Sequence, residues 1–252
     1  MALTSPLRVE APPVPAQYGG LLSVADVQET TDVHAAMGVE YASFLCSLPG
    51  LFAAPCEVVP DITYDQTKTT SGSQTVEGSP FVVYSAIECD LIGGPYTDQA
   101  RAKLLGGEEV PVAQAVAALA LNDPDLVVLA GDLSTVQDAI AALGDLEQYA
   151  AENYAGLPII HMSRKTATIL IAANALFPQL DGSLITGLGT PVAASGGYPD
   201  DVMWVTGQVH LWRTPVTAVD VPAQMSNQAI SLAERTYMAA IDCLVAVVGT
   251  VP

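Results

Sequence analysis

The side chains that could do chemistry are few and scattered in this chain. Its histidines, His34, His161 and His210, lie far apart, and the last two sit in strand-like apolar runs. Such histidines are typically packed or hydrogen-bonded rather than metal-bound. Two adjacent carboxylates, Asp200 and Asp201, follow a Gly-Gly-Tyr-Pro turn and offer the oxygen ligands that a hard cation prefers. A solvated loop tip is the simpler interpretation, so no metal ligand is predicted.

Motifs for cofactor binding and catalysis are missing as well. The Gly187-x-Gly189 pair has neither the third glycine nor the preceding strand of a dinucleotide-binding fingerprint. The chain contains no phosphate-binding GxxxxGKS/T loop, no GxSxG nucleophile elbow and no HExxH zinc motif. We therefore predict no catalytic residue, no cofactor and a protein that is not an enzyme.

The cysteines do not show the spacing of a zinc site. They include no CxxC pair and no Cys/His ligand pattern; they are Cys46, Cys56, Cys89 and Cys243. The sequence also shows no secretory signal, and its longest apolar runs, Val110–Leu121 and Ile241–Val251, are too short to span a bilayer. We expect free, buried thiols in a protein that folds in a reducing cytoplasm without a membrane partner.

The charge balance limits the partners of the chain. It has 27 acidic and 8 basic side chains, for a net charge of −19, in 252 residues. So few cations cannot neutralise many phosphates, which argues against tight nucleic-acid binding and against binding to anionic membranes. Yet half of the residues are apolar and only 14% are charged. This combination is typical of a subunit that buries much of its surface against copies of itself.

The stretch Cys56–Ile87 predicts a long β-hairpin with a polar tip. Its outgoing arm places Val58, Ile62 and Tyr64 on one face with the two-residue period of a strand. The return arm is also rich in β-forming residues, although Gly78 and Pro80 indicate a bulge or bend and an edge position. An isolated hairpin is marginally stable in water. The arm must therefore pack either on its own domain or on a neighbouring chain.

The remaining segments predict a mixed α/β fold of the α+β class. Tyr96–Leu121 has helical periodicity interrupted by Gly106-Gly107 and Pro111, which predicts one kinked helix or two in succession. Residues 124–174 alternate strand, helix, strand, helix, with a capping box at Ser134 and Gln137 and an N-cap at Ser163. The helix that follows the capping box is predicted to turn an apolar face to the core; that face consists of Val136, Ile140, Leu143 and Leu146. The segment Gly182–Asp201 predicts loops around one short strand, and Met203–Arg213 predicts a strand or a tight hairpin turning at Gly207-Gln208. The segment Gln228–Val248 predicts a helical or extended start and a β-rich end.

Two C-terminal stretches, LGTPVAASGGY with WVTGQVHLWRT (Leu188–Thr214) and NQAISLAERTYMAAIDC (Asn227–Cys243), resemble major capsid proteins of actinobacterial tailed phages. These proteins share a fold with encapsulin shells. The resemblance implies an arm at 1–20, an N-terminal segment of the peripheral region at 21–55 and an extended hairpin loop at 56–87. It further implies a spine helix with peripheral domain at 88–124, an axial domain at 125–201 and a return to the peripheral domain at 202–252.

The resemblance also implies the contact residues of a self-assembling shell. The hairpin contacts to a neighbouring subunit would be Val58, Ile62, Tyr64, Lys68, Phe81 and Val83. The N-terminal clamp would be Pro12, Pro13 and Pro15, and the loop at the capsomer centre would contain Gly196, Gly197, Tyr198, Asp200 and Asp201. Lys68 is the only lysine placed for a covalent cross-link, but no Lys/Asn pair can be assigned.

The implied function is a major capsid protein that forms hexamers and pentamers of an icosahedral head around double-stranded DNA, without sequence-specific DNA contacts. The implied location is the virion, after assembly in the host cytoplasm, and the further partners would be decoration, scaffold or portal proteins. Two alternatives stay open. One is an encapsulin-like compartment, and the other is a monomeric cytosolic α/β enzyme with a carboxylate site at Asp200-Asp201.

Overall fold

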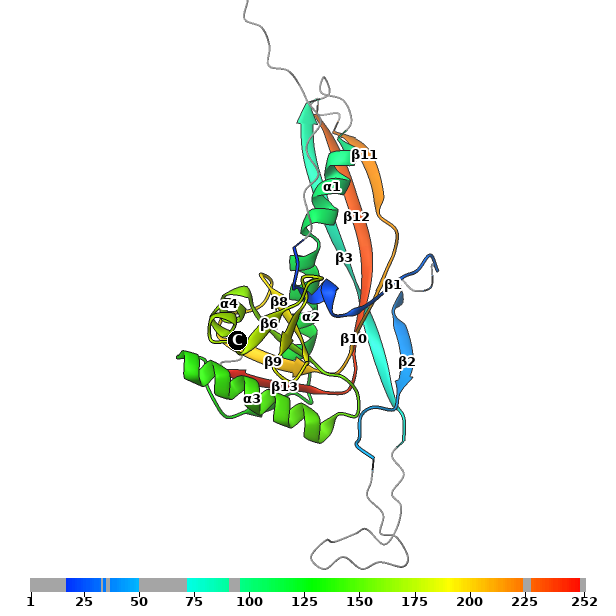
Figure 1. Ribbon diagram of the computed structural model, residues 1–252. Helices are drawn as coiled ribbons and strands as arrows, with labels where there is room; N and C mark the ends of the chain where they lie inside the picture. Colours follow the sequence, from blue (N-terminus) through cyan, green and yellow to red (C-terminus); the bar gives the residue numbers. More distant parts are fainter. Residues whose placement is uncertain are drawn as a thin grey trace, which may run out of the picture.

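The computed structural model contains two β-sheets that share a short junction (Figure 1). It describes residues 17–32, 34, 37–49, 72–90, 96–223 and 228–249. The first sheet, here called the long sheet, has the order β1-β10-β12-β3-β2, with β11 also paired to β12. The second, the compact sheet, has the order β4-β13-β9-β5-β8-β7-β6. Helices and strands together confirm the mixed α/β class.

The long sheet is built on two long antiparallel strands, β3 (Gln74–Asp90) and β12 (Gln228–Ile241), which pair from Gln228↔Asp90 to Ala239↔Ser79. Alternate residues of both strands, such as Val83 and Tyr237, enter the core. The shorter strands of this sheet are β1 (Asp26–Glu29), β2 (Val39–Ser43), β10 (Val209–Arg213) and β11 (Thr217–Ala223), and a 3-10 helix, η1 (Leu21–Ser23), precedes β1.

The predicted spine helix is divided in two. Helix α1 (Thr97–Gly107) packs on β12 and β3, and α2 (Glu109–Leu121) follows after a bend of 49°. The interruption inferred from Gly106-Gly107 is therefore confirmed. Pro111 falls in the first turn of α2, where its missing N–H costs no helical hydrogen bond. Within the described residues, no single helix is long and apolar enough to span a membrane. Helices α1 and α2 meet both requirements only when they are taken together, and the bend separates them.

The compact sheet carries the other two helices. Helix α3 (Val136–Asn153) begins at a capping box of Thr135 and Asp138, one residue later than predicted, and α4 (Arg164–Ala172) begins at the predicted cap, Ser163. The strands of this sheet are β4 (Val127–Leu129), β5 (Ile159–Ser163), β6 (Leu176–Pro178), β7 (Leu184–Thr186), β8 (Pro191–Ser195), β9 (Val202–Thr206) and β13 (Val245–Gly249). Residues 182–201 thus hold two short strands, not the one that was expected.

The predicted hairpin at Gly207-Gln208 is wrong. Strand β9 belongs to the compact sheet and β10 to the long sheet, so these two residues carry the chain from one sheet to the other. The chain returns between β12 and β13 through Asp242–Leu244. The two passages lie side by side, because Gly207 N donates to Leu244 O (2.9 Å) and Asp242 N donates to Gln208 O (3.0 Å). We call these five residues the junction.

Candidate subunit interface

The base of the extended hairpin is formed by β2 and the first residues of β3, which pair from Val39↔Gly78 to Ser43↔Gln74. The outgoing strand that the structure describes is therefore Val39–Ser43, earlier in the chain than the predicted start at Cys56. The predicted contacts Val58, Ile62, Tyr64 and Lys68 lie outside the described residues. Pro80 is just past the end of the β2 pairing, so β3 is an edge strand on that side there, as expected.

The return arm packs on its own subunit, which corrects the predicted contact face. Val83 is only 4% exposed, and Phe81 stacks on Tyr237 with ring centroids 5.7 Å apart. The intervening residues point the other way, since Val82 is 54% and Tyr84 is 69% exposed. The sequence Phe-Val-Val-Tyr is apolar at every position, so its alternation could not reveal which face enters the core.

The exposed residues of β3 belong to a larger apolar surface. On the neighbouring strands Val221 is paired with Ile230, and all the exposed members project from the same side of the long sheet. This surface, here called the open sheet face, consists of Val82, Tyr84, Val219, Val221 and Ile230. Helix α1 packs against β3, β11 and β12 of the same sheet (Figure 1). An apolar sheet surface of this kind is typical of a binding site for another protein.

A second apolar surface lies on the compact sheet's side of the molecule. Ile140 and Leu143 of α3 line a pocket of about 500 Å³ together with Leu188, which is 83% exposed. Ile140 was predicted to enter the core with Val136, Leu143 and Leu146, but it and Val136 are partly exposed. The buried positions of α3 are filled by alanines beside Leu143 and Leu146, so the buried stripe is rotated from the predicted one.

The chain entering η1 is fixed by a buried carboxylate at the bend between α1 and α2. Glu109 accepts hydrogen bonds from Leu21 N (2.7 Å) and Leu22 N (3.0 Å). Burial raises the pKa of Glu109, against the lowering effect of these hydrogen bonds. A side chain at Gly20 would collide with the Glu109 carboxylate, which requires glycine there. The predicted clamp, Pro12, Pro13 and Pro15, lies outside the described residues.

The same bend holds a buried ion pair. Arg235 Nη1 of β12 lies 3.1 Å from Glu108 Oε1, and Arg213 Nη1 of β10 lies 3.6 Å from the same oxygen. Glu108 and Arg235 are both buried. Removing one partner of such a pair leaves an uncompensated charge, so this contact fixes the spine helices to the long sheet.

The predicted capsomer-centre loop packs against α2 of its own chain. A side chain at Gly197 would collide with the Val110 carbonyl of α2, and Tyr198 is buried. Gly196, Asp200 and Asp201 are exposed, and Asp200 lies 3.4 Å from Lys165 Nζ. Only these three exposed positions are placed to meet another molecule.

His161 is a packed histidine, as predicted. Its ring nitrogens lie 3.0 Å from Tyr198 Oη and 2.8 Å from Thr206 Oγ1, and its ring stacks on Trp204. Complete burial lowers the pKa of His161 to about 3, so the ring is neutral. Among the described residues, no three His, Cys, Asp or Glu side chains are grouped to hold a metal ion.

The junction contains a buried aspartate that joins three parts of the chain. Asp242 Oδ1 accepts from Tyr41 Oη of β2 (2.6 Å), and Asp242 Oδ2 accepts from Tyr154 Oη after α3 (2.9 Å). Tyr154 Oη in turn accepts from Gln208 N (3.0 Å). Burial, and then the bond to Asp242, raises the pKa of Tyr41. The hairpin base, α3 and both junction passages therefore meet at one carboxylate.

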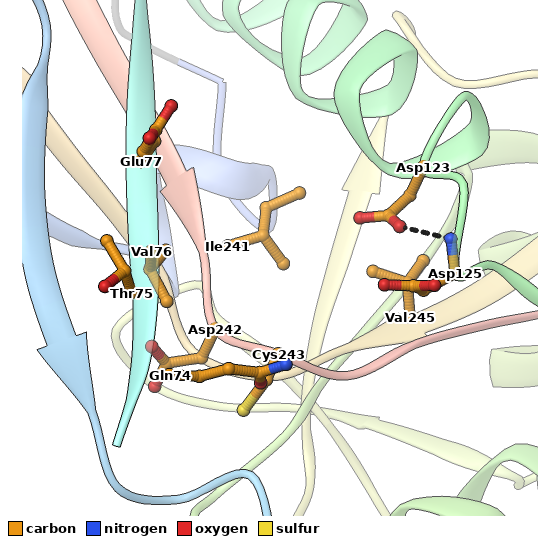
Figure 2. A pocket seen from close by; sticks show the side chains of 10 residues that line it. All are labelled: Gln74, Thr75, Val76, Glu77, Asp123, Asp125, Ile241, Asp242, Cys243 and Val245. Carbon is orange, nitrogen blue, oxygen red and sulfur yellow. Dashed lines mark hydrogen bonds between the residues drawn. The ribbon is translucent and has the colours of Figure 1, made fainter. Parts of the chain in front are cut away.

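Beside this aspartate, Cys46 and Cys243 form a disulfide with Cα atoms 5.4 Å apart. The prediction of free thiols is wrong for this pair, since sequence spacing could not reveal that residues 197 positions apart would meet. Cys56 and the side chain of Cys89 lie outside the described residues. Cys243 lines a pocket of about 230 Å³ (Figure 2). Its acidic lining residues are Glu77, Asp123, Asp125 and Asp242.

Comparisons with known proteins place the fold. No family model matches the chain, and no curated protein matches it. A solved capsid of an empty GTA particle is similar in structure, with a TM-score of 0.58 and 14% identity, over 99% of this chain and 96% of that one. A Mycobacterium phage Che8 structure gives a TM-score of 0.54 and 14% identity, over 98% and 96% of the two chains.

A virus-like particle from Pyrococcus furiosus is also similar, with a TM-score of 0.57 and 11% identity over 91% of both chains. The similarity covers nearly the whole chain, including both sheets and the spine helices. The chain has the tailed-phage major capsid fold, which also forms shells of the virus-like particle kind.

Proposed function

We propose that this chain is the major capsid subunit of a tailed-phage head. The observation that carries the proposal is the nearly complete coverage, 99% of this chain and 96% of the other, in the match to a capsid. A protein that shared only one domain with a capsid subunit would match that subunit over only part of its length. The open sheet face and the hairpin base add to the proposal, because both present surfaces that a second copy can cover.

Assembly would proceed by heterologous contacts, in which one surface of a subunit fits a different surface of the next copy. Such contacts form rings when the rotation closes, which yields hexamers and pentamers of an icosahedral shell. The hairpin of one subunit is the element proposed to reach the neighbour, and the open sheet face is a surface proposed to receive it. The exposed Val82 and Tyr84 replace Phe81 and Val83 as proposed contacts on β3.

The contents and location follow from the same proposal. A net charge of −19 suits a shell that encloses double-stranded DNA without binding it tightly. The subunit would be assembled in the host cytoplasm and released in the virion, with no catalytic role. Portal, scaffold and decoration proteins are the further partners that such a head implies.

A compartment of the encapsulin kind is a second candidate, favoured by the similarity to the Pyrococcus furiosus virus-like particle. The two candidates differ in what the shell encloses. Purified particles treated with nuclease on the outside and then opened should release double-stranded DNA if the chain is a phage capsid. Release of a cargo protein without DNA would favour the compartment instead.

A further inference from the structure

The disulfide joins two parts of the molecule that no sheet pairing connects directly. Cys46 lies just past the end of β2, where the chain leaves the long sheet toward the hairpin. Cys243 lies in the junction between β12 and β13. The bond therefore ties the root of the hairpin to the place where the two sheets meet.

Noncovalent contacts hold the Cys46 segment to the junction and to the residues that follow α3. Tyr41 Oη donates to Asp242 Oδ1 (2.6 Å), one residue before Cys243. Ala155 N donates to Leu45 O (3.1 Å), one residue before Cys46. The two sulfurs would thus stay close to each other when reduced. Oxidation then adds a covalent restraint to an arrangement that hydrogen bonds already favour.

We propose that Cys46 and Cys243 are a redox-controlled lock on the hairpin root. The pair is a dithiol in a reducing cytosol and a disulfide in an oxidising medium. The open lock leaves the segment from β2 to Cys46 free to shift against the junction, and the closed lock fixes it there. Closure after shell assembly is a part of the proposal that rests on the proposed function. Closure on oxidation is independent of that function.

The closing reaction needs a small-molecule disulfide as its oxidant. The Cys243 thiolate, which borders the open pocket, attacks one sulfur of that molecule and releases its other half as a thiolate. The Cys46 thiolate then attacks the Cys243 sulfur of the mixed disulfide and releases the second half. The two cysteines lose two protons and two electrons, and the oxidant is reduced to two thiols.

The pocket makes this lock selective for the charge of the reagent. Four of its described lining residues are carboxylates, and none is Lys or Arg (Figure 2). An anionic thiol is repelled from such a site and a cationic thiol is attracted, and added salt screens both effects. Cysteamine, a cationic thiol, should therefore open the lock faster than glutathione, which is anionic.

The first test uses the unaltered chain. Cells are lysed in an alkylating reagent, and the protein is compared by mass spectrometry with protein kept in air-equilibrated buffer containing oxidised glutathione. We expect alkylated Cys46 and Cys243 in the first sample and a cross-linked peptide pair in the second. Alkylated cysteines in both samples, or a cross-link already complete in the cytosol, would overturn the proposal.

The second test measures what the lock does. The melting temperature of the oxidised chain should fall by about 5 to 15 °C on reduction, because the bond closes a very long loop. This shift should vanish in Cys46→Ser and in Cys243→Ser and persist in Cys89→Ser, a matched change outside the bridge. Equal melting of oxidised and reduced wild-type chain would contradict a locking role.

The third test measures selectivity. The rate at which each thiol reduces the Cys46–Cys243 bond is divided by its rate on an uncharged reference disulfide. The normalised rate should be several-fold higher for cysteamine than for glutathione. The ratio of the two normalised rates should fall when the NaCl concentration is raised from about 0.02 M to about 0.5 M. A ratio that does not respond to salt would contradict the pocket's role. All three tests work on soluble chain as well as on particles. A monomer with redox-dependent melting would therefore sink the proposed function and still support the lock.

Discussion

At the scale of single residues, two buried carboxylates organise this molecule. Asp242 accepts from two tyrosines that belong to different parts of the chain, and Glu109 accepts from two backbone N–H groups at the entrance to η1. Neither could be singled out from the sequence, because neither belongs to a recognisable motif: Asp242 lies in an apolar run, and Glu109 follows Gly-Gly-Glu at the break in the helix. The structural role of a buried acidic side chain can be stated only when its hydrogen-bond donors are known.

Replacing Asp242 should destabilise the chain. Asp242→Asn keeps the shape but offers one acceptor oxygen to two tyrosine hydroxyls, so we expect a loss of about 1–3 kcal/mol in the free energy of unfolding. Urea denaturation under reducing conditions measures this loss without the disulfide. Asp200→Asn, at an exposed aspartate, is the matched control and should change the free energy by less than about 0.5 kcal/mol. Equal effects of the two changes would contradict the role given to Asp242.

Glu109 predicts a pH dependence with a definite sign. Burial raises its pKa above the ordinary value of 4.5, so the folded chain holds this proton more tightly than the unfolded chain does. Its contribution to stability is therefore greatest below that value and is lost as the pH rises through the raised pKa. Relative to Glu109→Gln, the wild-type chain should lose stability as the pH rises from below the ordinary value through the raised pKa of Glu109. Denaturation curves measured at a series of pH values above 4.5 check the sign, and the opposite slope would contradict it.

At the scale of elements, the sequence predicted the order of segments better than their partners. The break at Gly106-Gly107 and the cap at Ser163 were readable because glycine and N-cap serine act locally. Gly207-Gln208 predicts a hairpin turn as readily as a passage between sheets, because these residues suit a tight turn between two strands. Which sheet each strand joins depends on contacts with residues that are distant in the sequence. The order of residue types within one short segment does not reveal those contacts.

The open sheet face gives a test at this scale. Changing Val82 and Tyr84 together to lysine should leave the subunit folded, because both side chains point away from its core. It should reduce assembly at least tenfold, since charge would be buried at the subunit contact. Circular dichroism and sedimentation measure the two effects. Gln99→Lys, at an exposed position of α1 outside the open sheet face, is the control and should assemble normally.

At the scale of the whole molecule, the two sheets and the hairpin root are joined at one place. The junction, the Asp242 hydrogen bonds and the Cys46–Cys243 bond all lie there. Both the hairpin base and the core of each sheet are complete within one chain, so the subunit should fold before it assembles. Among the described residues, the open sheet face and the apolar pocket beside α3 are two surfaces that a single chain leaves uncovered.

Shortening the hairpin separates folding from assembly. Excision of Asp65–Ser73 with the arms rejoined should leave a soluble, folded subunit, because β2 and β3 pair through Ser43↔Gln74 without these residues. The shortened chain should form far fewer shells, since the proposed reach to the neighbour is reduced. Melting temperature and sedimentation report the two properties. Loss of folding would instead place the excised tip in the subunit's own core.

The most direct test of the central claim is electron microscopy of the purified chain over a range of concentrations. The account predicts closed shells, or rings of five and six subunits that convert into shells. A homogeneous monomer of about 26 kDa at every concentration would contradict it.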